Sequence, residues 1–114
     1  MGRSGDLPVF ATPALVALCE EAAVNVLKDG LSEGETTVGT RMEISHDAAS
    51  CLNATITAYA RVDGLDGRMI TLSVWAQDEA GVIGRGVHQR ARVKNDRLLA
   101  KAKQRLFGPR SCPQ

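Results

Sequence analysis

The sequence predicts an α+β domain in which an antiparallel sheet wraps around one long, central, apolar helix. Three observations predict it: an apolar stretch over residues 14–27 with start and stop signals, four later segments of alternating polarity, and short punctuated connections between them. A helix that is apolar on nearly all sides needs other elements to cover it. A sheet that curves around the helix is the simplest such cover.

The helix is expected to begin at Thr12, a suitable N-cap residue. Pro13 then occupies the first helical position, where its missing N–H costs nothing. The apolar run continues to Leu27, and Lys28-Asp29-Gly30 ends it, because glycine favours the position just past a helix.

Glu20 is one of two acids inside this apolar run. Its neighbours three and four positions away are all apolar, whereas Glu21 has Asn25 and Lys28 on its side of the helix. We therefore expect Glu20 to lie nearer the core than Glu21, where a carboxyl group needs a partner or a function. The alternative is a boundary glutamate that reaches water.

Four strands are expected, over residues 36–46, 52–62, 68–77 and 82–93, with turns at 63–67 and 78–81. Short loops favour an antiparallel meander. In the first strand, alternation places one set of side chains on a single face: Val38, Thr40, Met42, Ile44 and His46. Thr37 and Gly39 belong to the opposite face.

The last strand is expected to place its apolar side chains on one face: Ile83, Val87, Ala91 and Val93. A short basic helix follows over residues 95–105, and residues 108–114 are expected to form a disordered tail.

Composition excludes several classes of function. A net charge of +1 argues against strong nucleic-acid binding, and no apolar run is long enough to span a membrane. The three cysteines lack C-x-x-C spacing, which indicates a reduced, cytoplasmic setting. The sequence has only two scattered histidines besides, so no metal site is expected. No cofactor is expected, and Cys19 in mid-helix is expected to be a small core residue.

Three sequence blocks carry a resemblance to a known family. They are Val9-Phe10-Ala11-Thr12-Pro13 through Leu18-Cys19-Glu20, then Val38-Gly39-Thr40 through Ile44-Ser45-His46, then Gly84-Arg85-Gly86-Val87-His88-Gln89-Arg90. In their order and spacing, these blocks resemble the fluoroacetyl-coenzyme A thioesterase-like family of hotdog-fold proteins. The resemblance covers roughly residues 8–98.

This resemblance implies a hotdog fold, hydrolysis of a small acyl-coenzyme A thioester, and a homodimer with active sites at the subunit interface. It places the family's catalytic residues on Thr12, Glu20 and His46, and its substrate-contacting residues on Gly39 and Arg90. The hotdog domain is expected over residues 9–98, after a short N-terminal extension (1–8) and before a basic, partly disordered tail (99–114).

The chemistry of the three catalytic candidates suits thioester hydrolysis. His46 has a side chain that titrates near neutrality and is the natural base, or else it is a half-buried histidine at a strand end. Thr12 attacks the carbonyl, holds a water or bonds Glu20, or else serves only as the N-cap. Free N–H groups at the start of the helix are suited to the carbonyl oxygen.

The two substrate-contacting candidates also have alternatives. Gly39 would let a ligand approach the strand closely, or else it marks a bulge. Arg90 would fix Glu20 or bind a phosphate, or else it belongs to a solvated strand face shared with His88 and Arg92.

The sequence departs from the family pattern ahead of the first block. Family members usually carry another strand and a lid segment there, so we expect one strand fewer and an open sheet edge that a partner covers. Specificity for fluoroacetyl groups is therefore not carried over. A non-catalytic acyl-coenzyme A binder and an interaction scaffold remain the alternatives to a thioesterase.

Overall fold

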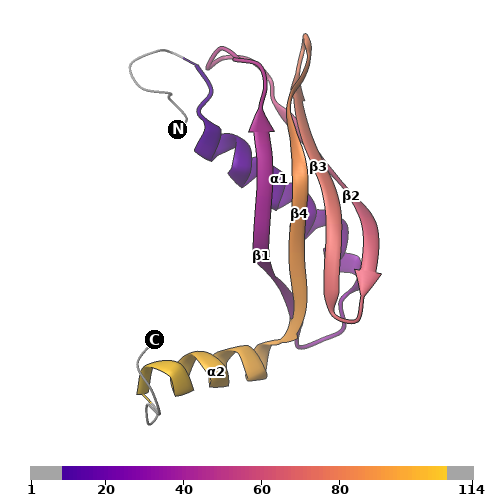
Figure 1. Ribbon diagram of the computed structural model, residues 1–114, viewed down its shortest axis with the longest axis vertical. Helices are drawn as coiled ribbons and strands as arrows, with labels where there is room; N and C mark the ends of the chain where they lie inside the picture. Colours follow the sequence, from indigo (N-terminus) through magenta and orange to yellow (C-terminus); the bar gives the residue numbers. More distant parts are fainter. Residues whose placement is uncertain (1–8, 108–114) are drawn as a thin grey trace.

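The computed structural model describes residues 9–107, so the predicted N-terminal extension and the 108–114 tail lie outside the described residues. The elements follow in the order α1 (Thr12–Leu27), a 3₁₀ turn η1 (Lys28–Gly30), β1 (Glu35–His46), β2 (Thr57–Asp66), β3 (Met69–Asp78), β4 (Gly81–Lys94) and α2 (Asn95–Phe107). Figure 1 shows α1 crossing one face of the sheet and α2 projecting away from its lower end.

The sheet is antiparallel, with the strand order β1-β4-β3-β2. The predicted α+β class is confirmed, and β2, β3 and β4 form the expected meander. The first strand is the exception, because β1 pairs with β4 and not with β2. The connection over residues 47–56 is long enough to cross the end of the sheet, which leaves β1 and β2 as its two edges.

The second strand lies further along the chain than predicted. Residues 52–56 form turns and loop, and β2 runs through Asp66 to a tight turn at Gly67, whose φ is 60°. The predicted turn at 63–67 is therefore mostly strand, with a register shift between Val62 and Gly64.

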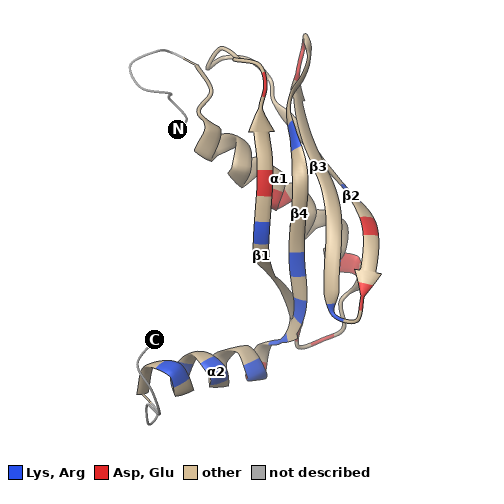
Figure 2. Cartoon of the chain, in the orientation of Figure 1, with Lys and Arg blue, Asp and Glu red and all other residues tan. Residues whose placement is uncertain are grey.

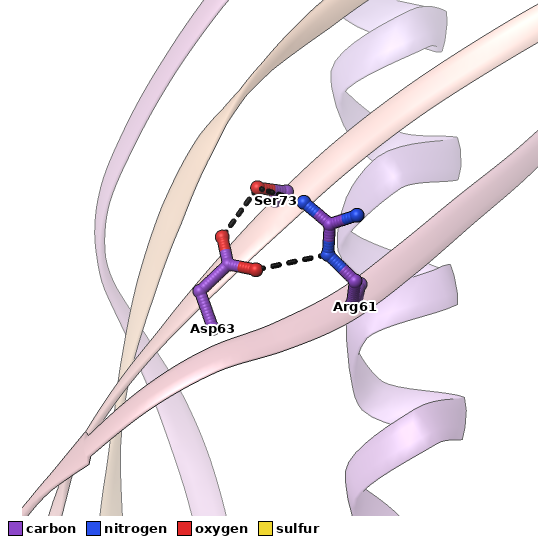
Figure 3. Close-up of polar contacts among 3 residues, drawn as sticks. All are labelled: Arg61, Asp63 and Ser73. Carbon is purple, nitrogen blue, oxygen red and sulfur yellow. Dashed lines mark hydrogen bonds and ion pairs between the residues drawn. The ribbon is translucent and has the colours of Figure 1, made fainter.

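Asp63 accounts for this continuation of β2. Its carboxylate accepts hydrogen bonds from the Ser73 hydroxyl and, at 3.0 Å, from the Arg61 Nε (Figure 3). These bonds, with Ser73 making the larger contribution, hold the pKa of Asp63 below its ordinary value. A bulge residue fixed in this way keeps two strands paired where the sequence by itself indicates a turn.

A second register shift corrects the predicted faces of β1. It lies between Gly39 and Arg41, so that Thr40 is an extra residue and Gly39 pairs with Arg90. Directly paired residues of antiparallel strands share a face. The bulge therefore brings Thr37 and Gly39 to the same face as His46, and the prediction that they lie on opposite faces is wrong.

The predicted faces of β4 are also wrong. Gly84, Gly86, His88 and Arg90 pair with Ala76, Val74, Leu72 and Ile70 of β3, which are all buried, so this row faces α1. Val87 pairs with Ser73 on the other face and is exposed. The glycines allow α1 to approach closely, since a Cβ at Gly84 would lie 2.8 Å from the Leu15 Cδ2 atom.

The core lies between one stripe of α1 and the sheet. Leu15 and Cys19 pack with Val74, Ala76 and Ile83, and Ala23 packs with Ile70 and Leu72. Elsewhere α1 is open, with Val24 and Val26 exposed. The expectation that the sheet covers this apolar helix on most sides is therefore wrong for a single chain.

Cys19 is fully buried, which confirms its predicted role as a small core residue. Burial raises the pKa of its thiol from 9.0 to about 11. Below pH 9 the thiol is neutral in both the folded and the unfolded state. As the pH rises from 9 toward 11 the thiol ionises only in the unfolded state, so the free energy of unfolding falls over this range.

We expect the free energy of unfolding to fall by about 2 kcal/mol more in the wild type than in Cys19→Ala between those two pH values. Urea denaturation of both proteins at a series of alkaline pH values measures this difference. Exposed Cys51 stays in both proteins, so its ionisation cancels. Parallel curves for the two proteins would contradict the effect.

Candidate active site

Thr12 and His46 form a hydrogen-bonded pair. Thr12 is the first residue of α1, and the N-cap is Ala11, which makes no side-chain capping bond. The predicted capping role of Thr12 is therefore wrong. Its hydroxyl is free to contact the end of β1, where Thr12 Oγ1 lies 2.9 Å from His46 Nδ1.

His46 is half-buried, and its second ring nitrogen is more enclosed than the first. Nε2 is buried and has no hydrogen-bond partner within residues 9–107. The ring of Phe10 meets the imidazole edge-on, with 6.4 Å between ring centroids. Apolar contact on one side and the Thr12 hydroxyl on the other fix the imidazole, so that Nδ1 is the nitrogen available for proton transfer from Thr12.

This pair lines a cavity of about 210 Å³. Its other walls are Val9, Phe10 and the segment that follows β1, Asp47-Ala48-Ala49. The expected row of free N–H groups at the start of α1 is not present over residues 13–15. Pro13 lacks an N–H, and the N–H groups of Ala14 and Leu15 both donate to the Ala11 carbonyl.

Several hydrogen bonds hold the cavity wall in place. The N–H groups of Asp47 and Ala48 donate to the Ile83 carbonyl, and the Phe10 N–H donates to the Ser50 carbonyl at 2.7 Å. The buried Ser50 hydroxyl donates to Asp78 at 2.6 Å, which lowers the pKa of Asp78. The wall is thus tied to α1, β3 and β4 together.

A second polar cluster lies further along β1, toward its start. A Cβ placed on Gly39 would lie 3.3 Å from Arg90 Nη1, 3.3 Å from His88 Cε1 and 3.5 Å from Glu20 Oε2. The Gly39 backbone thus faces a glutamate, an arginine and a histidine at contact distance. Any side chain at this position would fill the space above them.

Arg90 is 7% exposed, so the alternative that it belongs to a solvated strand face is wrong. Its Nε donates to the Thr37 hydroxyl and its Nη2 to the Thr37 carbonyl, both at 2.9 Å. Burial lowers the pKa of Arg90, and the charge of Glu20 partly opposes that change. The guanidinium is thereby held rigidly beneath Gly39.

His88 is a member of this cluster that sequence reasoning did not select. It is 1% exposed, and its Nδ1 lies 2.7 Å from the Arg41 carbonyl, which accepts the ring N–H. Its Nε2 then accepts a hydrogen bond from Arg90 Nη1 at 3.1 Å. The alternation of Gly84, Gly86, His88 and Arg90 along the strand was the available signal for it.

Glu20 is exposed, as is Glu21, so the expectation that Glu20 lies nearer the core is wrong for a single chain. It is close to Gly39 and Arg90, but eight residues after Thr12 on α1, which is about 12 Å along the helix. The sequence-predicted residues therefore form two clusters: Thr12 with His46, and Glu20 with Gly39 and Arg90.

A metal-binding cluster and a membrane-spanning helix are both absent from the described part of the chain. Residues 9–107 hold no group of three or more His, Cys, Asp or Glu side chains that could bind a metal ion. Within the same residues, no helix has the length and apolar character needed to cross a membrane.

Comparison with known proteins places this arrangement in a family. The profile described as fluoroacetyl-CoA-specific thioesterase, FlK, matches residues 1–96. The chain belongs to the FlK family. A fluoroacetyl-CoA thioesterase from Streptantibioticus cattleyicolor is 35% identical over 97 residues, which cover 85% of this chain and 70% of that protein.

Solved structures agree with this membership. A variant of the FlK thioesterase in complex with fluoroacetate and CoA has a TM-score of 0.82 at 33% identity, over 90% of this chain and 80% of that one. A hot-dog-like protein from Thermanaerovibrio acidaminovorans has a TM-score of 0.84 at 33% identity, over 95% of this chain and 80% of that one. The predicted hotdog fold is confirmed.

Proposed function

We propose that this protein is a thioester hydrolase that acts on small acyl-coenzyme A substrates. The observation that carries the proposal is the Thr12–His46 hydrogen bond at the mouth of a cavity, in a chain of the FlK family. A hydroxyl in contact with an imidazole is the minimum needed to generate a nucleophile near neutral pH.

In the proposed reaction, His46 Nδ1 accepts the proton of the nucleophile as the nucleophile attacks the thioester carbonyl. The nucleophile is either the Thr12 hydroxyl or a water that takes the hydroxyl's place beside Nδ1. As the carbon–sulfur bond breaks, the protonated imidazole gives the proton to the departing coenzyme A thiolate. Attack by water releases the carboxylic acid directly. Attack by Thr12 leaves an acyl ester on Thr12, which a water activated by His46 then hydrolyses, and the imidazole returns the proton to the Thr12 oxygen. Glu20 and the Gly39 backbone contact the acyl group, and the Arg90 guanidinium offsets negative charge near Glu20.

We further propose that the working enzyme is a homodimer paired through the β1 edges. In one chain the two clusters are separated by the six positions of β4 from Gly84 to Arg90, about 20 Å at 3.3 Å per residue. Antiparallel pairing of two β1 strands about a twofold axis would set His46 of one subunit toward the Gly39 end of the other. Each site would then contain Thr12 and His46 from one subunit and Glu20 and Arg90 from the other.

Two features of the single chain support this pairing. β1 is a sheet edge, and an exposed edge is normally covered. The apolar side chains of α1 that the sheet leaves open, such as Val24 and Val26, would gain cover in a dimer.

Free cysteines at positions 19 and 51 are consistent with a reducing, cytoplasmic setting.

Thiol release from a panel of short, branched and aryl acyl-coenzyme A esters tests the proposal, with Glu20→Gln beside the wild type. We expect kcat for the best ester to fall about 100-fold in Glu20→Gln, because the charge beside Gly39 and Arg90 is lost while the shape is kept. Glu21→Gln is the matched control and should retain the wild-type rate, since it removes the adjacent exposed acid.

The outcomes separate the candidate functions. Release that disappears only in Glu20→Gln supports a thioesterase and identifies the acyl class. Equal release in both variants would remove Glu20 from the proposed site. Thermal stabilisation by coenzyme A without release of thiol from any ester would favour a non-catalytic binder.

A further inference from the structure

A buried chain of hydrogen bonds runs from the bulge in β1 through His88 to Arg90. The extra residue of the bulge, Thr40, is held by its hydroxyl, which donates to the Gln89 carbonyl at 3.2 Å. The next residue, Arg41, presents its backbone carbonyl to the His88 ring, with 2.7 Å between the oxygen and Nδ1. Bulges re-aim groups beside functional sites, and this one gives a buried imidazole a fixed hydrogen-bond acceptor.

Both neighbours of the His88 ring impose the same tautomer. A carbonyl oxygen only accepts hydrogen bonds, so Nδ1 carries the ring proton that meets Arg41. A guanidinium only donates, so Nε2, 3.1 Å from Arg90 Nη1, presents its lone pair. A second proton on the ring would point an N–H at the Arg90 cation and remove this acceptor. The two contacts therefore keep His88 neutral and in one orientation.

Three of the five N–H groups of Arg90 hold its guanidinium in place. Nε and Nη2 donate to Thr37, and Nη1 donates to His88. Nη1 carries a second N–H, and it is also the Arg90 atom nearest to the space above Gly39, 3.3 Å from where a Cβ would lie. Since Thr37 fixes one side of the guanidinium and His88 the other, the direction of this second N–H is set before any ligand arrives.

The charged groups around His88 come from three elements, and Figure 2 shows acidic residues on α1 and basic residues on β1 and β4. On α1, Glu20 Oε2 lies 3.5 Å from the Cβ position of Gly39, and His88 Cε1 lies 3.3 Å from the same point. On β1, the Arg41 side chain forms a 3.0 Å ion pair with a neighbouring glutamate. On β4, Arg90 contacts the ring directly. Glu20 and the second N–H of Nη1 thus border one space.

We propose that His88 is a positioning residue, which in its Nδ1–H tautomer directs one N–H of Arg90 at the space above Gly39. The proposal rests on the proposed thioesterase function for what fills that space, the acyl end of the thioester. An N–H group fixed there in advance needs no reorganisation as negative charge develops during the reaction. The bulge at Thr40 is the origin of this geometry, because it supplies the carbonyl that sets the tautomer.

Nitrogen NMR of the histidine rings tests the tautomer without any need for turnover. The chain has two histidines, so in untagged protein labelled with ¹⁵N-histidine, His46→Ala leaves the signals of His88 alone. We expect a protonated Nδ1 and an unprotonated Nε2 at neutral pH. A proton on Nε2, alone or together with one on Nδ1, would overturn the assignment.

Two substitutions of His88 each keep one of its two ring contacts and serve as controls for each other. The amide oxygen of His88→Gln replaces Nε2 as the acceptor for Arg90, whereas the amide N–H of His88→Asn replaces Nδ1 as the donor to the Arg41 carbonyl. We expect kcat for the best ester to fall about 30-fold in His88→Asn but only about threefold in His88→Gln, because only the first loses the bond to a charged group, with KM within about twofold of the wild type in both. Urea denaturation should show similar losses of stability, so a purely structural role would not separate the two rates.

Hydrogen exchange at the Arg90 Nε–H gives a second readout that is independent of catalysis. Its NMR signal is identified by its loss in Arg90→Lys, and we expect exchange about tenfold faster in His88→Asn than in His88→Gln. Equal kcat values or equal exchange rates in the two variants would remove the positioning role, and continued hydrolysis would leave the thioesterase proposal standing. If no ester is hydrolysed but exchange still separates the variants, His88 positions Arg90 and the thioesterase proposal fails.

Discussion

His46→Ala is expected to lower kcat for the best acyl-coenzyme A ester about 1,000-fold, within the range that general acid–base groups supply. The imidazole is the group in direct contact with the Thr12 hydroxyl, at 2.9 Å, and no second histidine can replace it, because His88 is occupied by the Arg41 carbonyl and Arg90. Steady-state thiol release measures the loss. Denaturation midpoints would show whether the variant remains folded.

Thr12 provides the matched pair of controls for this prediction. Thr12→Val removes the hydroxyl at nearly constant volume and should reproduce most of the loss. Thr12→Ser keeps the hydroxyl and should retain measurable turnover. A His46→Ala enzyme within threefold of the wild type would mean that the pair is a structural contact and that the proton acceptor lies elsewhere.

Gly86→Ala is expected to have the largest effect on stability, lowering the free energy of unfolding by about 3 kcal/mol. A Cβ at this position would overlap the carbonyl oxygen of Glu43 and lie 2.7 Å from the Ile44 Cα. Both obstacles are backbone atoms of β1, so relief requires that β1 and β4 move apart. Urea denaturation of the purified variant measures the change.

Gly64→Ala is the matched control, because it adds the same methyl group to a strand glycine with nothing within 4 Å. We expect its free energy of unfolding to change by only about 0.5 kcal/mol. If the two variants proved equally stable, the contact between β1 and β4 at Gly86 would be looser than these distances indicate.

The helix and the number of strands could be predicted from the sequence because both depend on local patterns. The apolar run ending at Lys28-Asp29-Gly30 and the alternation over later segments are properties of neighbouring residues. The strand order could not be predicted in the same way, since the pairing of β1 with β4 depends on the path of the 47–56 connection and not on its composition.

The predictions of which side chains share a face of β1 and of β4 were wrong for a related reason. One extra residue, Thr40, reverses the alternation in β1. Gly39 next to it was the available signal, and the bulge that it offered as an alternative to a ligand contact is present. The prediction for β4 followed its apolar residues, whereas the row toward α1 consists of Gly84, Gly86, His88 and Arg90. Buried polar groups that hydrogen-bond one another are indistinguishable from a solvated face when only polarity is counted.

The candidate residues could be selected from the sequence, but their grouping could not. Thr12 and His46 meet because α1 and the end of β1 lie together, 34 residues apart in sequence. Glu20 remains away from them in one chain; the eight-residue spacing on α1 gives this separation, but it does not show that Glu20 lies beside Gly39 and Arg90. The contribution of His88 also depended on tertiary contacts, since its two hydrogen bonds reach Arg41 on another strand and Arg90 on its own.

His46 pairs with Gly84, and Gly39 pairs with Arg90. The length of β4 between Gly84 and Arg90 therefore sets the distance between the two clusters of the proposed site. In the proposed twofold dimer each chain supplies one cluster to each site, so the spacing between the two clusters within a chain sets the spacing between the two active sites. An insertion or deletion between Gly84 and Arg90 would therefore put both active sites out of step together. Length in this segment should be far less free to vary than side-chain identity on its outer face.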